Sequence, residues 1–357
     1  MKRSIKKLFH FQESKAGWEL PLASGLCIGF PLMAGWYFNH VGESKLVSLA
    51  GLSILYLPLS APYLKRMLVL VLVGLGLIGS YAVGMLLSDA GLFKAVFLGV
   101  YAMVVYAFLH FIKMKRAPGA FFFVMLSVTG AFTTNTVDGA FQKTGWMAVG
   151  CLFTLCVASV FTAFMPAKNK SGASVPPPPG AHVYTTEALI FGTMMGLSVA
   201  AAMWFRLESP AWVAISCLAV LQGSSRGHVW QRSLQRFSGT VVGTALTLGL
   251  VMMQPPFWLI LACITLSQII LEYLMSRNYA LAVVFITILT VFLSIDSNDV
   301  LQSGYRLILY RFVDISLGCV VGAIGGWLIY HQHLKHYLSE KVGKAMTSVK
   351  AKGESHP

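Results

Sequence analysis

The feature that most constrains this chain is a series of long apolar runs, separated by short segments that hold most of its charges. Only 11% of the 357 residues are charged, whereas 56% are hydrophobic; a soluble domain averages about 25% charged residues. Apolar runs of about 20 residues are long enough to cross a bilayer as helices, which satisfy their backbone hydrogen bonds internally. We therefore expect an all-α polytopic membrane protein whose main partner is the lipid bilayer.

The apolar runs predict about twelve transmembrane helices. Their expected bounds are 18–38, 46–64, 67–87, 92–112, 118–132, 144–164, 184–205, 210–221, 237–253, 257–274, 279–293 and 307–330. Several of these spans are shorter than a straight crossing requires, and 210–221 is the shortest. Short spans indicate tilted neighbours, local thinning or a water-filled vestibule, and a vestibule is typical of a transporter or a channel.

The positions of the basic residues set the expected orientation. The formal net charge of +14 raises the question of a nucleic-acid partner, but the charges lie in short loops between apolar runs, so we expect none. With the amino terminus inside, most of the 27 lysines and arginines fall on the inner side, as the positive-inside rule requires. Both termini are therefore expected to be cytoplasmic.

A proline run divides the chain into two halves of six spans each. We expect a first transmembrane half at 1–166, a cytoplasmic Pro-rich linker at 167–183, a second half at 184–331 and a basic cytoplasmic tail at 332–357.

The two halves resemble each other in sequence. Residues 114–132 align with 275–293, and the glycines of 71–84 fall near those of 236–249. Because each half has an even number of spans, we expect two parallel six-helix repeats, related by an axis along the membrane normal.

Arg232 and Arg236 are four residues apart, so they share one helix face where that helix enters the membrane. One interpretation is that they anchor the helix, with their side chains snorkelling to the interface. The other is an anion site, because planar guanidinium groups bind a carboxylate through paired hydrogen bonds. Gln222, at the end of the short span, can donate a hydrogen bond to a substrate or to the backbone. Both interpretations stay open at this stage.

Small residues and buried charges mark the other candidate positions. Gly239 and Gly243, and likewise Gly318 and Gly322, predict close helix packing. The remaining candidates are acids and one arginine within or beside spans. Arg311 and Asp314 are three apart and predict an ion pair, which serves as a structural clamp or in coupling and gating. Glu19 and Glu187 recur at the inner start of each half and are candidates for proton exchange.

The sequence carries no pattern for cofactor, metal or enzyme chemistry. The six cysteines lie inside apolar runs without metal-ligand spacing. Phosphate-binding loops, nucleophile elbows, zinc motifs and dinucleotide fingerprints are all missing from the sequence. We therefore expect no cofactor, no metal, no enzymatic activity and no ATP-driven transport by this chain alone.

Residues 209–246, 277–289 and 306–323 together resemble the fusaric acid resistance protein-like family, which groups with the aromatic acid exporters of bacterial inner membranes. The resemblance rests on Leu221 and Gln222, then Arg232, Gln235, Arg236, Gly239 and Thr240, then Arg277, Asn278, Tyr279 and Ala280, then Arg311, Asp314 and Gly318. It covers the second half well and the first half loosely, because Lys65 and Arg66 stand roughly where the arginine pair would be. It adds Asn278 to the candidate substrate-binding residues.

The resemblance implies efflux of organic, aromatic, carboxylic acids across the inner membrane, driven by the proton gradient. It also implies a periplasmic adaptor as a partner and, through distant similarity to plant malate channels, a homodimer. Two alternatives remain: a passive organic-anion channel, and a membrane scaffold that transports nothing. An uncoupler distinguishes the channel from an exporter. Transport that is unaffected by charge-neutralising changes at Arg232 and Arg236 would indicate the scaffold.

Overall fold

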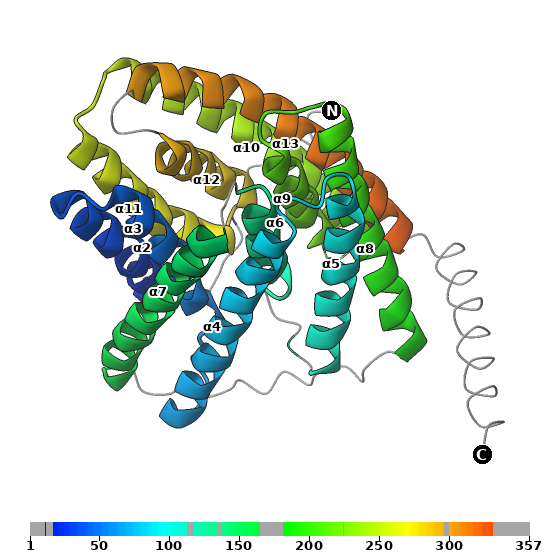
Figure 1. Ribbon diagram of the computed structural model, residues 1–357, viewed down its shortest axis with the longest axis horizontal. Coiled ribbons are helices and arrows are strands. Elements are labelled where there is room, and N and C mark those ends of the chain that lie inside the picture. The colour runs from blue at the N-terminus through cyan, green and yellow to red at the C-terminus, as the bar shows by residue number, and fades with distance from the viewer. Residues whose placement is uncertain are drawn as a thin grey trace.

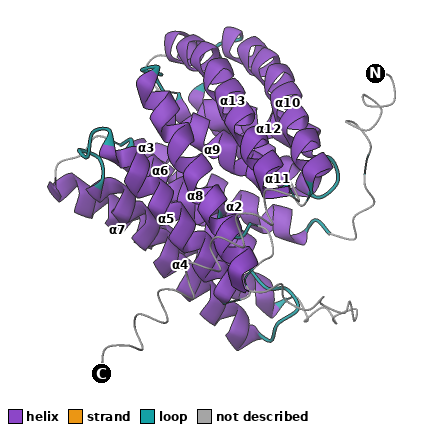
Figure 2. Cartoon of the chain, turned by 90° about the vertical axis from the view of Figure 1, so that its right-hand side faces the viewer, coloured by secondary structure: helices purple, strands orange, loops and turns teal. Residues whose placement is uncertain are grey.

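A computed structural model describes residues 17–112, 118–133, 137–164, 181–223, 225–295 and 300–330, together with Phe11 and Met114. In these ranges the chain forms helices joined by turns and loops, without a β-strand (Figure 2). The predicted all-α fold class is therefore confirmed.

The helices follow the predicted spans in order (Figure 1). Those of the first half are α2 (Glu19–Tyr37), α3 (Val41–Ala50), the 3-10 helix η1 (Gly51–Tyr56), α4 (Tyr63–Leu86), α5 (Phe93–Phe111), α6 (Phe121–Ala131) and α7 (Val137–Ala163). Those of the second half are α8 (Ala181–Trp204), α9 (Pro210–Leu221), α10 (Arg226–Met252), α11 (Phe257–Met275), α12 (Tyr279–Ser294) and α13 (Val300–Tyr330). The second predicted span is shared by α3 and η1.

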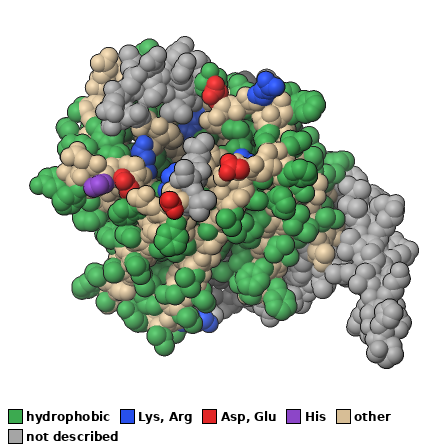
Figure 3. Space-filling model, viewed as in Figure 1, with side chains coloured by type: hydrophobic (Ala, Val, Ile, Leu, Met, Phe, Trp, Pro, Cys, Tyr) green, Lys and Arg blue, Asp and Glu red, His purple; other side chains and the backbone are tan. Residues whose placement is uncertain are grey.

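Seven of these helices are long and apolar enough to cross a membrane: α2, α4, α5, α7, α8, α11 and α13. Helices α6, α9 and α12 are apolar but shorter, so a crossing by every one of the twelve stays a prediction. Large hydrophobic side chains cover most of the face shown in Figure 3, as a lipid-facing surface requires. The chain is a multi-pass membrane protein.

The expected linker and tail fall almost entirely outside the described residues. Helix α8 begins at Ala181, so the last three residues of the expected linker at 167–183 are helical instead. Residues 165–180 and 331–357 lie outside the description.

Helices pack in the same order within each half. In the first half α2 packs against α3, α3 against α7, α7 against α4 and α4 against α6. In the second half α8 packs against α9, α9 against α13, α13 against α10 and α10 against α12. The halves meet through α5 against α8 and through α11 against α2. The two parallel repeats stay a prediction, which these matching contacts support.

Glycines bring the helices around the candidate site into close contact. On α10, a Cβ atom at Gly239 would lie 2.5 Å from the carbonyl oxygen of Ala280, and one at Gly243 would lie 2.8 Å from that of Val284. On α13, Gly318 and Gly322 face the backbone of α9 in the same way. Such contacts let helix backbones approach closely, and they set how close α10 lies to α12 and α13 to α9.

Candidate functional site

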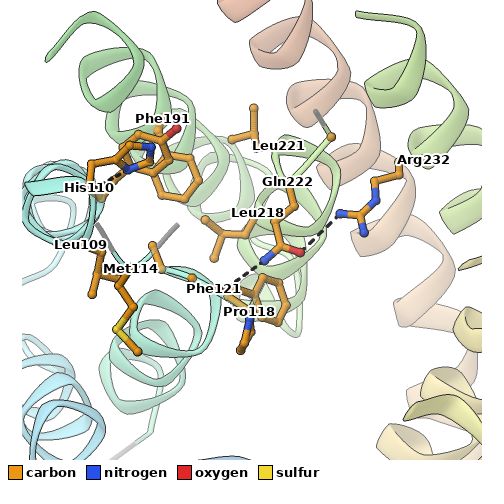
Figure 4. Close-up of a pocket in the computed structure, with 14 residues that line it drawn as sticks. Leu109, His110, Met114, Pro118, Phe121, Phe191, Leu218, Leu221, Gln222 and Arg232 are labelled. Atoms are coloured by element: carbon orange, nitrogen blue, oxygen red, sulfur yellow. Dashed lines mark hydrogen bonds between the residues drawn. The ribbon is translucent and has the colours of Figure 1, made fainter. Parts of the chain in front are cut away.

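A cavity of about 250 Å³ lies between the two halves, at the helix ends that the charge pattern predicts to be cytoplasmic. Its walls come from α5, α6, α8, α9 and α10, and they are mainly apolar and aromatic. Figure 4 shows His110 and Phe191 on one wall and Gln222 and Arg232 on the other. A concave, aromatic cavity with a few polar groups is the usual form of a small-molecule site.

Arg232 contributes the cationic group at one end of the cavity. It donates to the carbonyl oxygen of Ala219 at 3.3 Å and to Oε1 of Gln222 at 3.4 Å, and its guanidinium carbon lies 4.6 Å from the centre of the Tyr279 ring. Its Nε is buried without a hydrogen-bond partner among the described residues. The neutral amide acceptor therefore leaves the positive charge of Arg232 uncompensated.

Gln222 links the two halves across the cavity. Its Nε2 donates to the carbonyl oxygen of Pro118, next to α6, at 3.2 Å, while its Oε1 accepts from Arg232 on α10. A substrate carboxylate is a stronger acceptor for a guanidinium than an amide is. It can therefore replace Gln222 at Arg232, and the bridge to the first half would then lose one of its two hydrogen bonds.

Arg236 lies one turn further along α10 and is only 3% exposed. Its terminal nitrogen donates to Oγ of Ser216 on α9 at 3.4 Å, and its Nε has no partner within the described ranges. Both arginines thus contact α9 from one face of α10, as their spacing predicts. This depth is unlike that of a snorkelling anchor, whose charged end stays in water.

A third arginine, Arg311 on α13, is also buried, with 3% of its surface exposed. Its guanidinium carbon lies 3.7 Å from the centre of the Trp212 ring on α9. None of its three guanidinium nitrogens has a hydrogen-bond partner in the part of the chain that the structure describes. A buried charge without hydrogen-bond partners is costly, and among the described acids only the nearby carboxylate of Asp314 acts on it; a bound anion would supply the missing hydrogen-bond acceptors.

No hydrogen bond joins Arg311 and Asp314 among the described residues, although their charges lie close enough on α13 to attract each other, so the predicted ion pair stays a prediction. Asp314 is 1% exposed, and its Oδ2 is without a partner in the described ranges. The hydrogen bond is missing because Arg311 extends across to the Trp212 ring rather than along its own helix to Asp314.

These three arginines form a series along α9, which we call the arginine line: Arg232, Arg236 and Arg311. Their contacts on α9 are Gln222, Ser216 and Trp212 respectively. These contacts are six and four residues apart, which is about one to two helical turns, or roughly 6–9 Å along the helix axis. The arginine line therefore leads from the cavity into the interior of the helix bundle.

The other predicted substrate residue, Asn278, has a structural role. Its Oδ1 accepts from the backbone N–H of Leu281 at 3.2 Å and caps α12. It does not line the cavity, although the neighbouring Tyr279 contacts Arg232. Asn278 Nδ2 is buried and has no partner among the described groups.

The structure separates the two acids that are candidates for proton exchange. Glu187 on α8 accepts from the hydroxyl of Tyr106, a cavity residue, at 3.5 Å. Glu19 begins α2, next to Trp18, whose ring stacks on Tyr273 of α11 at 3.7 Å. Only Glu187 therefore lies beside the cavity.

Sequence reasoning missed the aromatic wall and Trp212. The cavity is lined by Tyr106, Leu109, His110, Met114, Pro118, Gly119, Ala120, Phe121, Phe191, Leu218, Leu221, Gln222, Gly223 and Arg232. Aromatic residues are common on every span, so composition does not distinguish these. One usable signal was present: Tyr106 and His110 are one helical turn apart, and histidine is unusual inside an apolar span.

Comparison with known proteins supports the assignment of the second half. Residues 197–325 match the family model described as fusaric acid resistance protein-like. The chain is 31% identical over 156 residues to the uncharacterized membrane protein YvaC of Bacillus subtilis (strain 168). That alignment covers 44% of this chain and 25% of the relative, so the chain matches about a quarter of that protein's length. No solved structure matches the chain. The matched region includes α9, α10, α12, and the part of α13 that carries Arg311. Residues 197–325, about a third of the chain, are therefore similar to the fusaric acid resistance protein-like family.

Proposed function

We propose that this protein exports organic acids, in particular aromatic carboxylates, across the bacterial inner membrane. The observation that carries the proposal is the arginine line, and above all Arg311, whose guanidinium is buried without a hydrogen-bond partner in the described chain. Two buried guanidinium groups, Arg236 and Arg311, repel each other unless an anion lies between or beside them. A carboxylate supplies the missing charge and the missing hydrogen-bond acceptors at once.

The cavity is the proposed entry site. The carboxylate binds Arg232 in place of Gln222, while the ring of the substrate packs against Phe121, Phe191 and Tyr106. Aromatic pairs add about 0.5–1.5 kcal/mol beyond the area they bury, which favours an aromatic over an aliphatic acid of similar size. From Arg232 the carboxylate then moves to Arg236 and to Arg311.

Proton coupling is assigned to acids near each end of this path. Glu187 accepts a hydrogen bond from the cavity residue Tyr106, and Asp314 lies one turn from Arg311 on α13. Uphill export that collapses when an uncoupler is added would support this part of the proposal. Uphill export that survives the uncoupler would contradict it.

A passive anion channel is the second candidate, and the arginine line itself favours it. Successive sites of similar chemistry allow one anion to displace the next, as conduction requires. The two candidates differ in one measurement, because a channel passes carboxylate down its gradient at the same rate with or without an uncoupler.

Flux of labelled benzoate into proteoliposomes tests the proposal. R232Q, R236Q and R311Q should each lower the flux by at least tenfold, since each removes a charge from the path. R206Q is the matched control, because Arg206 is an exposed arginine in the turn between α8 and α9, off the arginine line. Unchanged flux in all three line variants would refute the proposed path, and lost flux in R206Q would indicate a general effect of charge.

A further inference from the structure

The cavity holds a second group that can carry positive charge, His110 on α5. Its ring stacks on that of Tyr106 with 4.3 Å between the ring centres. Tyr106 in turn packs against Phe191 at 4.7 Å, and its hydroxyl donates to Glu187. Tyr106 thus joins His110, one turn later on α5, to two residues one turn apart on α8. This corner lies where the two halves join.

The other junction between the halves carries a related corner. In the turn after α11, the guanidinium carbon of Arg277 lies 3.6 Å from the centre of the ring of Tyr273, which is in the last turn of α11. Tyr273 stacks on Trp18, which directly precedes Glu19 on α2. Each corner therefore combines a tyrosine, a basic residue four positions later and an acid from the first helix of the other half.

The basic residue distinguishes the two corners. Arginine stays charged at every physiological pH, whereas imidazole has an ordinary pKa of about 6.5 and changes charge between about pH 5 and 8. Arg277 is not among the residues that line the cavity, and His110 is. A titratable group thus occupies the corner that faces the candidate substrate site.

The hydrogen bonds of His110 determine which nitrogen titrates. Nδ1 lies 3.1 Å from the carbonyl oxygen of Tyr106. A carbonyl oxygen only accepts, so Nδ1 carries the proton of the neutral ring and Nε2 takes up the second one. Among the described residues, the charged groups beside the cavity are Glu187 from α8 and Arg232 from α10. The cavity residues that the structure describes on α6 and α9 have no titratable side chain.

We propose that His110 is a second anion-binding group of the cavity, and that its protonation sets the affinity of the cavity for carboxylates. This inference rests on the proposed function, since it concerns the same site. Protonated His110 adds a positive charge to a cavity of about 250 Å³ that already holds Arg232. Binding of a proton and of a carboxylate is therefore mutually favourable, and each raises the affinity of the other.

The sign of the effect follows directly. As pH falls, His110 becomes protonated and carboxylate binds more tightly; as pH rises, the charge is lost and binding weakens. A weak acid that enters a cell in its neutral form releases a proton inside. Because the charge pattern predicts that the cavity is on the cytoplasmic side, acidification by the substrate itself would increase the affinity of the site.

Binding of labelled benzoate to the purified chain in nanodiscs, at pH 7.5 and 5.5, tests this proposal. Benzoate stays mostly ionised at both values, because a carboxyl group of this kind has a pKa near 4. The wild type should bind about tenfold more tightly at pH 5.5, as expected for one added charge near the anion. H110N should bind weakly at both pH values, and H110R tightly at both.

Two other variants serve as controls. R277H places a titratable group in the corner away from the cavity, so it should keep the wild-type pH dependence. H228N removes another histidine near Arg232, one whose pKa burial and the charge of Arg232 lower from its ordinary value. A pH dependence that persists in H110N, or disappears in H228N, would overturn the assignment to His110.

The remaining outcomes separate this inference from the proposed function. Wild-type binding of benzoate with equal affinity at both pH values overturns the role of His110 and leaves the carboxylate site intact. Failure of the wild type to bind benzoate, salicylate or indole-3-acetate at either pH overturns the carboxylate site, and the role of His110 with it.

Discussion

Replacing Arg311 by methionine together with Asp314 by leucine should make the empty protein more stable and its transport weaker. Both replacements are apolar and keep part of the volume of the original side chains, and neither leaves a buried charge behind. In the wild type, three guanidinium nitrogens lack hydrogen-bond partners within the described chain, and each buried polar group left unsatisfied costs about 1–3 kcal/mol. Contact with the Trp212 ring at 3.7 Å offsets about 2 kcal/mol of this cost.

The balance favours the variant. Replacing a whole buried ion pair by apolar groups of similar volume stabilises other proteins by about 1–4 kcal/mol, and we expect R311M/D314L, which leaves neither charge behind, to fall in that range. The same change removes a charge-assisted hydrogen bond to the passing carboxylate, worth about 1.5–3 kcal/mol. The half-saturating concentration of benzoate should therefore rise by roughly ten- to a hundredfold.

Two measurements on one preparation check both effects: thermal unfolding in detergent and benzoate flux in proteoliposomes. R311K is the control, because lysine keeps the charge but loses the planar group that stacks on Trp212. A loss of stability of more than about 1 kcal/mol in R311M/D314L would refute the reasoning. It would show that the guanidinium group stabilises the fold and is not reserved for binding an anion.

Three further predictions concern packing, affinity and topology. G239L should disrupt the contact between α10 and α12 and lower the yield of folded protein. G249L on the same helix should not, because no described atom lies within 4 Å of a Cβ at Gly249. Size-exclusion chromatography compares the two variants, and equal profiles would contradict the packing argument. R236K should keep the fold yet raise the half-saturating concentration of benzoate by roughly ten- to a hundredfold, since a point charge replaces a planar fork; normal transport at low benzoate would leave anchoring as the better interpretation. In a chain without native cysteines, an impermeant thiol reagent added from the periplasm should label S297C and not S174C; labelling of S174C would reverse the topology.

The amino-acid sequence was sufficient for the fold class and for the order of the helices. Apolar runs and basic loops reflect the cost of placing charges and unpaired backbone groups in lipid, and that cost acts on each segment independently of its neighbours. This is why the predicted bounds agree with those of α4, α5 and α11 to within a few residues. The spacing of Arg232 and Arg236 placed both on one helix face for a reason that is also local, the period of about 3.6 residues per turn.

Only the tertiary structure decided what these residues face. The predicted pair of Arg311 and Asp314 assumed that neighbours on one helix bind each other, but Arg311 contacts Trp212, almost a hundred positions earlier in the chain. Asn278 caps a helix rather than lining the cavity, and His110 and Arg232 come together there from different halves. Partners of this kind depend on which helices pack side by side and on how closely their glycines let them approach. Hydropathy along one span carries no record of either.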